Sequence, residues 1–441
     1  MKSNRKMNYP VWKAALRWML WAAFGVCVVM PVKAQLTDSQ VQEMRTKIRA
    51  ALFVPEPLPA LDAKSYGSFA PEPGVIAERV TYATEYGLRI PAIVYRPEKV
   101  RGKIPGIVVV NGHGADKASW YSWYTGVEYA RAGAMVVTYD PIGEGERNDD
   151  HKDATGEHDR VIDVPGVPER MGGAMVTDAM QGVSYLLSRP EVDGRRIGLL
   201  GFSMGSFVAS LTGAVDARIH AVFLTGGGDL DGPGGYWDAS HMVMCQSGPY
   251  KALRFLGDRP AAIFALQARR GPTFIWNGTD DTVVAIPEHG PEFFEDMRRR
   301  TIALNGSEKN VFTTYFDPGA GHRPAWVTKP AAEWLAEQLH FAKWSAKKIR
   351  RLPTIRIADW AAVKGVHLNH SAKREDRDGG LRALDVDAPK LTPEQLSVLP
   401  MAEWERERAQ FAYSSWAADA IADVKRRDGA NAGPTRGTDD N

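Results

Sequence analysis

The sequence predicts an α/β fold, with a mostly parallel central sheet, helices on both of its faces and a mainly helical C-terminal extension. Between about residue 75 and residue 345, short apolar segments alternate with longer segments of helical periodicity. The apolar segments are hydrophobic along their whole length, which is typical of strands covered on both faces. The 441 residues suffice for one large domain with extensions or for two modest domains.

The first segment, residues 1–34, has the pattern of a signal peptide. Basic residues between Lys2 and Arg17 precede an apolar segment, residues 18–30, that is short for a membrane span. Residues 32–34 then place small side chains at the cleavage positions. We therefore expect a periplasmic or secreted protein without membrane contact after cleavage, the alternative being an uncleaved anchor. The net charge of +2, without a basic stripe, indicates no nucleic-acid partner.

Cleavage would leave Cys245 as the only cysteine, because Cys27 lies in the signal segment. A single cysteine forms no internal disulfide. No strand and no sharp turn leads into Cys245, so we interpret it as a buried or cleft-lining residue rather than a nucleophile.

The elements are expected in the following order. Residues 35–74 hold a helix over 38–53, capped by Thr37 or Asp38, and a proline-rich extended strap. A hairpin over 75–84 and 89–96 opens the catalytic domain, residues 75–348. Further strands of this domain are expected at 104–111, 134–140, 197–202, 219–225, 272–277 and 311–316. Helices are expected at 121–132, 171–187 and 325–348.

Two segments lie outside this alternation. Residues 226–271 begin with glycines and carry aromatic side chains, which favours a cap over a pocket, and a surface excursion is the alternative. We predict that Trp237 and His241 in this segment, with Gly112, contact the substrate. Residues 349–441 form the C-terminal extension, with an amphipathic segment over 400–424 and a polar tail, predicted to be disordered, from Lys425.

The main candidate for chemistry is the pentapeptide Gly201-Phe-Ser-Met-Gly205, a G-x-S-x-G motif. It lies between a predicted strand and a predicted helix, which is the setting of a nucleophile elbow. The flanking glycines would allow strand and helix to approach closely, with Ser203 in a strained conformation. The motif also arises by chance in a glycine-rich chain, so the interpretation depends on partners elsewhere.

A serine nucleophile requires a base held by a carboxylate. Asp281 follows the strand over 272–277, with Asp280 as the alternative acid, and His322 lies in a glycine-rich loop after the strand over 311–316. An aspartate in a turn and a histidine in a solvated loop are common individually. Together they complete the order serine, acid, histidine, which is far more specific than any one of them.

The oxyanion of the reaction needs two backbone donors. One is the N–H of Met204, directly after the nucleophile. We place the second at the N–H of His113, in the loop Asn111-Gly-His-Gly114, with Ala115 as the alternative.

Two polar segments are interpreted without a catalytic role. Residues 140–147 lack the lysine and hydroxyl of a nucleotide-binding loop and are expected to be the loop after a strand. Residues 148–159 are rich in carboxylates and imidazoles, but their spacing matches no zinc or calcium motif. We therefore predict a solvated acidic loop there, no metal and no cofactor.

Five segments together resemble the α/β-hydrolase superfamily, and within it the dienelactone hydrolase-like and acetyl xylan esterase-like branch, with prolyl oligopeptidase catalytic domains as relatives. They are residues 201–205, 111–114, 140–145, 278–281 and 321–322. The resemblance covers about residues 75–345, and Asn111 departs from it where such proteins often carry histidine. It implies an α/β-hydrolase fold and cofactor-free hydrolysis of carboxylic esters through an acyl-enzyme. Exported bacterial members of this group often act on acylated plant polysaccharide.

The sequence therefore predicts an exported serine carboxylesterase that acts on a small-molecule or glycan acyl ester. A small serine peptidase of prolyl-oligopeptidase type is one alternative, although there is no room for the N-terminal propeller of those enzymes. A catalytically silent glycan-binding protein is the other, although a binding module has no need of Ser203, Asp281 and His322.

Overall fold

The computed structural model describes residues 35–152, 156–232, 243–368 and 380–431, with side chains up to Asp428. The predicted signal peptide, residues 1–34, lies outside the described part. Among the described helices, none combines the length and the apolar character needed to cross a membrane.

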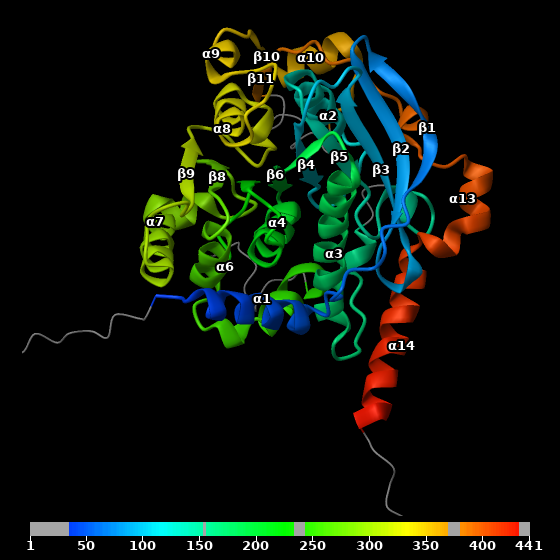
Figure 1. Ribbon diagram of the computed structural model, residues 1–441, viewed down its shortest axis with the longest axis vertical. Helices are drawn as coiled ribbons and strands as arrows, with labels where there is room; N and C mark the ends of the chain where they lie inside the picture. The colour runs from blue at the N-terminus through cyan, green and yellow to red at the C-terminus, as the bar shows by residue number, and fades with distance from the viewer. Residues whose placement is uncertain (1–34, 153–155, 233–242, 369–379, 432–441) are drawn as a thin grey trace, which may run out of the picture. The chain divides into compact units, whose positions relative to one another are not determined.

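A nine-stranded sheet forms the centre of the fold, in the order β1-β2-β3-β5-β4-β6-β7-β8-β9 (Figure 1). The first three strands and β5 pair antiparallel, and all pairs from β5 to β9 are parallel. The strands are β1 (Lys64–Glu72), β2 (Val75–Ala83), β3 (Arg89–Pro97), β4 (Ile104–Val110), β5 (Met135–Tyr139), β6 (Val192–Phe202), β7 (Ala221–Thr225), β8 (Thr273–Gly278) and β9 (Thr313–Asp317). The predicted mostly parallel sheet is confirmed.

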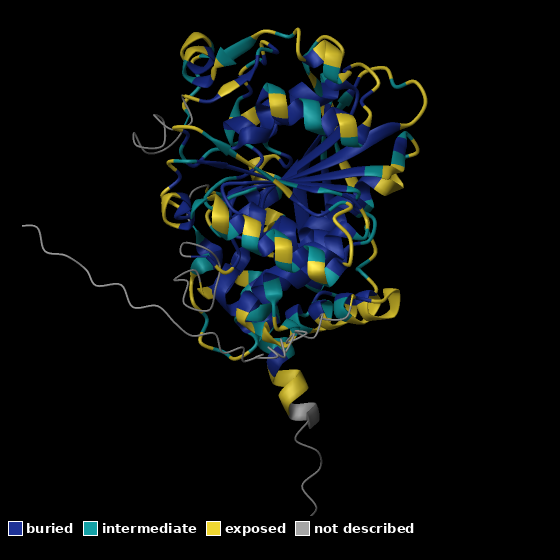
Figure 2. Cartoon of the chain, turned by 90° about the vertical axis from the view of Figure 1, so that its left-hand side faces the viewer, coloured by how far each residue is buried: buried dark blue, intermediate teal, exposed yellow. Residues whose placement is uncertain are grey.

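Both faces of the sheet are covered because successive side chains of a strand point to opposite sides. On β4, Val108 and Val110 belong to one hydrophobic cluster, and Ile107 and Val109 belong to a second. Figure 2 shows the sheet as a buried layer between helices whose outer sides are exposed. The first cluster includes α1 (Asp38–Leu52), α3 (Val167–Ser188), α4 (Met204–Val215), α5 (Gly248–Ala252), α6 (Arg259–Ala268), α7 (Ile286–Asn305) and α14 (Tyr413–Asn431). The second includes α2 (Trp120–Ala132), α8 (Lys329–Leu339), α9 (Ala346–Ile349), α10 (Ile357–Lys364), α12 (Pro393–Leu396) and α13 (Met401–Glu407).

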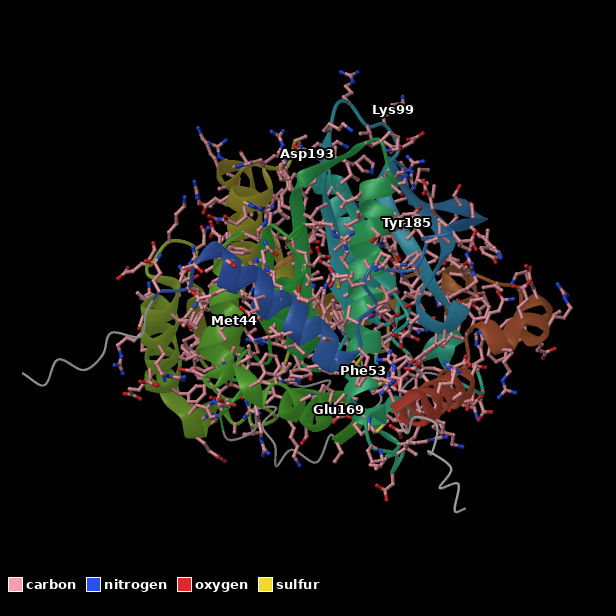
Figure 3. All side chains as sticks on the ribbon, turned by 60° about the horizontal axis from the view of Figure 1, so that its bottom comes forward. Met44, Phe53, Lys99, Glu169, Tyr185 and Asp193 are labelled. Carbon is pink, nitrogen blue, oxygen red and sulfur yellow. The ribbon has the colours of Figure 1, made fainter. Side chains whose placement is uncertain are left out.

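Helix α1, near the start of the described residues, packs against this core. Thr37 caps it through a capping box with Gln40, as the sequence predicts for Thr37 or Asp38. Its end at Phe53 adopts a left-handed conformation, and the Phe53 ring lies 3.6 Å from the guanidinium carbon of Arg170 on α3 and 5.1 Å from that of Arg427 on α14. Figure 3 shows Phe53 at this meeting point of the first and last helices.

Four expectations about local structure need correction. The proline-rich strap contains an edge strand, β1, which pairs with β2. The helix expected over 325–348 is a 3₁₀ turn at Ala325–Val327 followed by α8 and α9, because His340 ends α8 in a left-handed conformation. The last part of segment 226–271 is α6, a buried crossover helix between β7 and β8. Helix α14 continues to Asn431, into the tail predicted to be disordered.

Buried polar contacts attach the C-terminal extension to the sheet. The ammonium group of Lys117 lies 2.5 Å from the Asp140 carboxylate and 2.7 Å from that of Glu146, and all three side chains are buried. The Glu146 carboxylate also accepts hydrogen bonds from the backbone N–H groups of Val398 and Leu399. The acid therefore has its full set of partners only with the extension in place.

A second attachment joins α14 to the turn between β2 and β3. The indole N–H of Trp416 donates to the Glu85 carboxyl at 2.7 Å. Burial raises the pKa of Glu85 to about 8, against the lowering effect of the Trp416 hydrogen bond. Glu85 is therefore largely a neutral acid in the folded protein at neutral pH.

This shift predicts a pH-dependent contribution to stability that Glu85→Gln should remove. The folded state retains the Glu85 proton between pH 4.5 and about pH 8, whereas the unfolded chain releases it. The unfolded state therefore binds fewer protons, and wild-type stability falls as pH rises through this interval, in total by on the order of 4 kcal/mol. Urea unfolding at about pH 5 and about pH 9 should show Glu85→Gln gaining stability relative to wild type at the higher pH.

Glu288→Gln, at an exposed position on α7, is the control and should follow wild type at both pH values. Parallel pH dependence of wild type and Glu85→Gln would contradict the assignment.

Candidate active site

Ser203 lies on a sharp turn between β6 and α4, with φ 56° and ψ −120°. A Cβ at Gly205 would lie 2.1 Å from the carbonyl oxygen of Val110, and one at Gly201 would lie 2.3 Å from the carbonyl oxygen of Gly205. Gly201 is therefore required for the close approach of β6 and α4, as the sequence predicts, and Gly205 for the close approach of α4 to the end of β4. Ser203 itself is half-buried, so its hydroxyl lies in a partly accessible position at the carboxyl edge of the sheet.

Asp281 and His322 are in direct contact. Nδ1 of His322 donates to Oδ2 of Asp281 at 2.8 Å, and both side chains are buried. Burial alone would raise the pKa of Asp281, but His322 and the backbone N–H groups of Val283 and Val284 more than offset it, so that the pKa is lowered. Asp281 is thus an ionised acceptor that leaves Nε2 of His322 as the proton-accepting nitrogen. Asp280 is exposed and contacts Thr279 instead.

The acid loop and the histidine loop are held together by backbone hydrogen bonds. The N–H of Asp280 donates to the carbonyl of Ala320 at 2.8 Å, and that of Thr279 donates to the carbonyl of Asp317 at 3.0 Å. The Thr225 hydroxyl, at the end of β7, donates to the carbonyl of Arg323 at 2.8 Å. These bonds place His322 beside the elbow.

Two contacts show how close His322 lies to the serine. Its ring centroid is 4.8 Å from that of Phe202, the residue before Ser203. A Cβ at Gly226 would lie 2.7 Å from Cε1 of His322. The structure thus brings the predicted base to the end of the strand that carries the predicted nucleophile.

The loop after β4 lies directly against Ser203. A Cβ at Gly112 would lie 3.1 Å from Cβ of Ser203, so this glycine, predicted to contact substrate, adjoins the predicted nucleophile. Its N–H donates to the Tyr121 hydroxyl, and the N–H of Ala115 donates to the carbonyl of Gly112. Ala115, the alternative oxyanion donor, is therefore occupied.

The two favoured oxyanion donors remain available. Met204 is the first residue of α4, so its N–H has no acceptor within the helix. Within the described residues, no hydrogen bond engages the backbone N–H of His113. The other two predicted substrate-contacting residues, Trp237 and His241, lie outside the described residues.

The loop over 148–159 differs from its prediction. Asn148, Glu157 and His158 are buried, and Oδ2 of Asp159 lies 2.7 Å from Nε2 of His113. The expectation of a solvated acidic loop holds for Asp150 and Lys152, which are exposed, but it is wrong for residues 157–159, which turn inward against the oxyanion loop. Cys245 is buried, as predicted, and its thiol donates to Asp159.

Asp229, in the loop after β7, is a buried acid that sequence reasoning missed. Neither carboxyl oxygen has a hydrogen-bond partner among the described residues. Burial raises the pKa of Asp229 well above its usual value, and the negative charge of Asp281 adds to this effect. The pKa of Asp229 is thus shifted in the direction opposite to that of Asp281, and Oδ2 of Asp229 lies 3.8 Å from Nε2 of His289. Its sequence context, a glycine-rich run after a strand, contains no signal that would separate it from an ordinary turn residue.

Part of the chain is similar to a known protein family and to curated proteins. Residues 70–225 match the profile of the acetyl xylan esterase family (AXE1), a range that includes Ser203 and the oxyanion loop but ends before Asp281 and His322. The chain is 28% identical over 137 residues to YtaP of Bacillus subtilis (strain 168), which is 30% of this chain and 46% of YtaP. It is 28% identical over 145 residues to PA2218 of Pseudomonas aeruginosa, 33% of this chain and 35% of that protein. The chain thus spans less than half the length of each of these curated relatives.

Among solved structures, methylesterase BT1017 is 18% identical with a TM-score of 0.55, and the match covers 88% of this chain and 76% of that protein. Acetyl xylan esterase 1 from Thermoanaerobacterium sp. is 18% identical with a TM-score of 0.46, over 71% of this chain and all of that protein (100%). The first likeness confirms the α/β-hydrolase fold. The profile match confirms the resemblance to the acetyl xylan esterase-like branch and supports a carboxylic-ester hydrolase.

The contrast among three aspartates predicts distinct effects of amide substitution. Asp281→Asn should lower kcat about 10⁴-fold, because an amide neither holds the His322 tautomer nor stabilises the imidazolium. Asp280→Asn, at an exposed position, and Asp229→Asn, at a buried position that does not contact His322, should retain activity within severalfold. Steady-state hydrolysis of a chromogenic ester by the four proteins measures this, with circular dichroism to verify folding. A large loss in Asp229→Asn or Asp280→Asn but not in Asp281→Asn would overturn the assignment of the acid.

Proposed function

We propose that this protein is an exported serine carboxylic-ester hydrolase that acts through an acyl-enzyme. The observation that carries the proposal is the buried Asp281–His322 pair, joined at 2.8 Å beside the elbow that holds Ser203. A carboxylate–imidazole pair next to a strained, partly exposed serine is the arrangement that nucleophilic acyl transfer requires.

In the proposed mechanism, Nε2 of His322 removes the hydroxyl proton of Ser203 as the oxygen attacks the ester carbonyl. Asp281 orients the imidazole and stabilises its protonated form. The imidazolium then gives the proton to the departing alcohol, which leaves an ester of Ser203. A water molecule, deprotonated by His322, hydrolyses this ester and releases the acid.

The negative charge on the carbonyl oxygen would be stabilised by the N–H groups of Met204 and His113. Both belong to backbone segments fixed by packing, since α4 is buried and the Gly112 N–H is tied to Tyr121. Prepositioned donors of this kind each contribute about 3 kcal/mol to stabilisation of the transition state.

The proposed substrate class is an acylated glycan, with removal of acetyl groups from plant polysaccharide as the leading case. The profile match supports this class, because the matched family is described as acetyl xylan esterase and the match includes the elbow and the oxyanion loop. The proposal of export depends on the signal-peptide pattern of residues 1–34.

Hydrolysis of p-nitrophenyl esters from acetyl to octanoyl by purified residues 35–441 tests the activity. We expect preference for acetyl and a loss of kcat on the order of 10⁶ in Ser203→Ala. Ser188→Ala, exposed at the end of α3, is the matched control and should behave as wild type. Preference for long acyl chains would contradict the deacetylase assignment. Unchanged activity in Ser203→Ala would contradict the nucleophile, and failure of both ester hydrolysis and fluorophosphonate labelling would favour the silent binding protein.

Export predicts the N-terminus of the mature protein. Expression of the full chain in a Gram-negative host should yield periplasmic protein that begins at Gln35, as read by N-terminal sequencing. Recovery of intact chain in the membrane fraction would instead support the uncleaved anchor.

A further inference from the structure

Four side chains with metal-binding atoms meet next to the oxyanion loop: His113, His158, Asp159 and Cys245. One ligand atom from each lies within 4.8 Å of the others, and this is the one such group of three or more in the described part of the chain. Nε2 of His113 is 2.7 Å from Oδ2 of Asp159 and 3.6 Å from Sγ of Cys245, and this Sγ is 2.9 Å from Oδ1 of Asp159. The four residues come from the loop after β4, the loop after β5 and the turn at Val243–Ser247.

His158 provides an independent indication of a ligand. It is fully buried, and its ring stacks on that of His113 with the centroids 4.8 Å apart. Nδ1 lies 3.0 Å from the carbonyl oxygen of Ile142, and since a carbonyl only accepts, Nδ1 carries the proton. Nε2 is therefore a bare lone pair, and it has no hydrogen-bond partner among the described residues. A buried acceptor without a donor is unfavourable unless something else binds it.

We propose that these four residues bind one zinc ion. Thiolate, imidazole and carboxylate are all established zinc ligands, and four protein ligands are typical of a structural site. Tetrahedral zinc separates its ligand atoms by about 3.3–3.8 Å, given bond lengths of 2.0–2.3 Å. The separations among the ligand atoms of His113, Asp159 and Cys245 are 2.7 Å, 2.9 Å and 3.6 Å, and a ligand atom of His158 lies within 4.8 Å of them. Zinc binding would therefore draw the side chain of His158 inward and move Asp159 slightly away from His113.

The charges and protons balance. Cys245 loses its thiol proton to solvent as the sulfur–zinc bond forms, and the Asp159 carboxylate binds as the acceptor that it already is toward His113 and Cys245. The proton on Nε2 of His113 moves to Nδ1, so one proton is released per zinc. Two negative ligands then neutralise the divalent ion. The bond from Nδ1 of His158 to the Ile142 carbonyl is the outer contact that commonly orients a zinc-bound imidazole.

The rival interpretation of this cluster is a cysteine nucleophile with a histidine base. The thiol of Cys245 donates to Asp159 rather than to His113, and it is completely buried. The contacts therefore favour a ligand over a nucleophile.

Zinc at this position would join the oxyanion loop to two other loops through the side chain of His113. Its role is to position the backbone at residue 113, not to take part in chemistry. The inference does not depend on ester hydrolysis, because none of the four proposed ligands belongs to the set Ser203, Asp281 and His322.

The test uses residues 35–441 without a histidine tag, stripped with a chelator and then supplied with zinc or cobalt(II). We expect one zinc per chain by elemental analysis after gel filtration, release of one proton per ion and an increase in Tm. The cobalt form should show thiolate-to-metal charge-transfer absorption, which only Cys245 can supply because it is the single cysteine of residues 35–441. The spectrum of the wild-type protein therefore tests coordination by Cys245 without a substitution that could disturb folding.

Cys245→Ser should abolish the charge-transfer band, and His158→Gln should weaken zinc binding by more than the roughly 10–100-fold cost of losing an outer-shell contact. His340→Asn, at an exposed left-handed position where asparagine is tolerated, is the control and should bind as wild type. The absence of stoichiometric zinc, a cobalt spectrum without the thiolate band, or equal zinc binding by wild type and His158→Gln would each overturn the proposal. Ester hydrolysis without zinc binding would leave the proposed function intact and remove only the metal site.

Discussion

The strained backbone at Ser203 is the constraint on which the candidate site depends. A serine at φ 56° and ψ −120° is unfavourable by about 1–3 kcal/mol in isolation, and it persists only where its surroundings determine it. Here the N–H of Ser203 donates to the carbonyl of Thr225, and its own carbonyl accepts from Ser206. Helix α4 is buried along its length, so the turn cannot relax without separating the helix from the sheet.

The parallel sheet brings the other residues of the candidate site to Ser203. The carboxyl ends of β4, β6, β7, β8 and β9 meet at one edge of the sheet, so residues distant in sequence converge there. Thr225 illustrates the economy of the arrangement: its carbonyl receives the N–H of Ser203, and its hydroxyl holds the carbonyl of Arg323 in the histidine loop. Thr225 of β7 thus fixes the position of the candidate nucleophile relative to the loop that carries the candidate base.

Sequence reasoning succeeded where the relevant signal is local. The apolar runs located the strands, and the Gly201 and Gly205 pair indicated a steric need that the distances bear out. It failed where the determinant is a contact between distant segments. The pairing of β1 with β2 forms despite the prolines nearby. Asp159 at the inward end of the loop after β5 is held by His113 and Cys245, which lie far from it in sequence. No motif spacing can record a cluster assembled from three loops.

The oxyanion loop, after β4, is anchored by side chains to several other parts of the fold. Asn111 occupies a position where histidine is frequent in the related branch, and here its side-chain amide donates to the Tyr139 carbonyl while its oxygen accepts from Ser122. Asn111 therefore anchors the loop to β5 and α2 and leaves backbone donation to its neighbours. Farther along, Lys117 pairs with Glu146, whose carboxylate also binds the N–H groups at residues 398 and 399. Removal of one partner of a buried carboxylate has a large cost in folding free energy. The C-terminal extension therefore stabilises, through Glu146 and Lys117, the loop that adjoins Ser203.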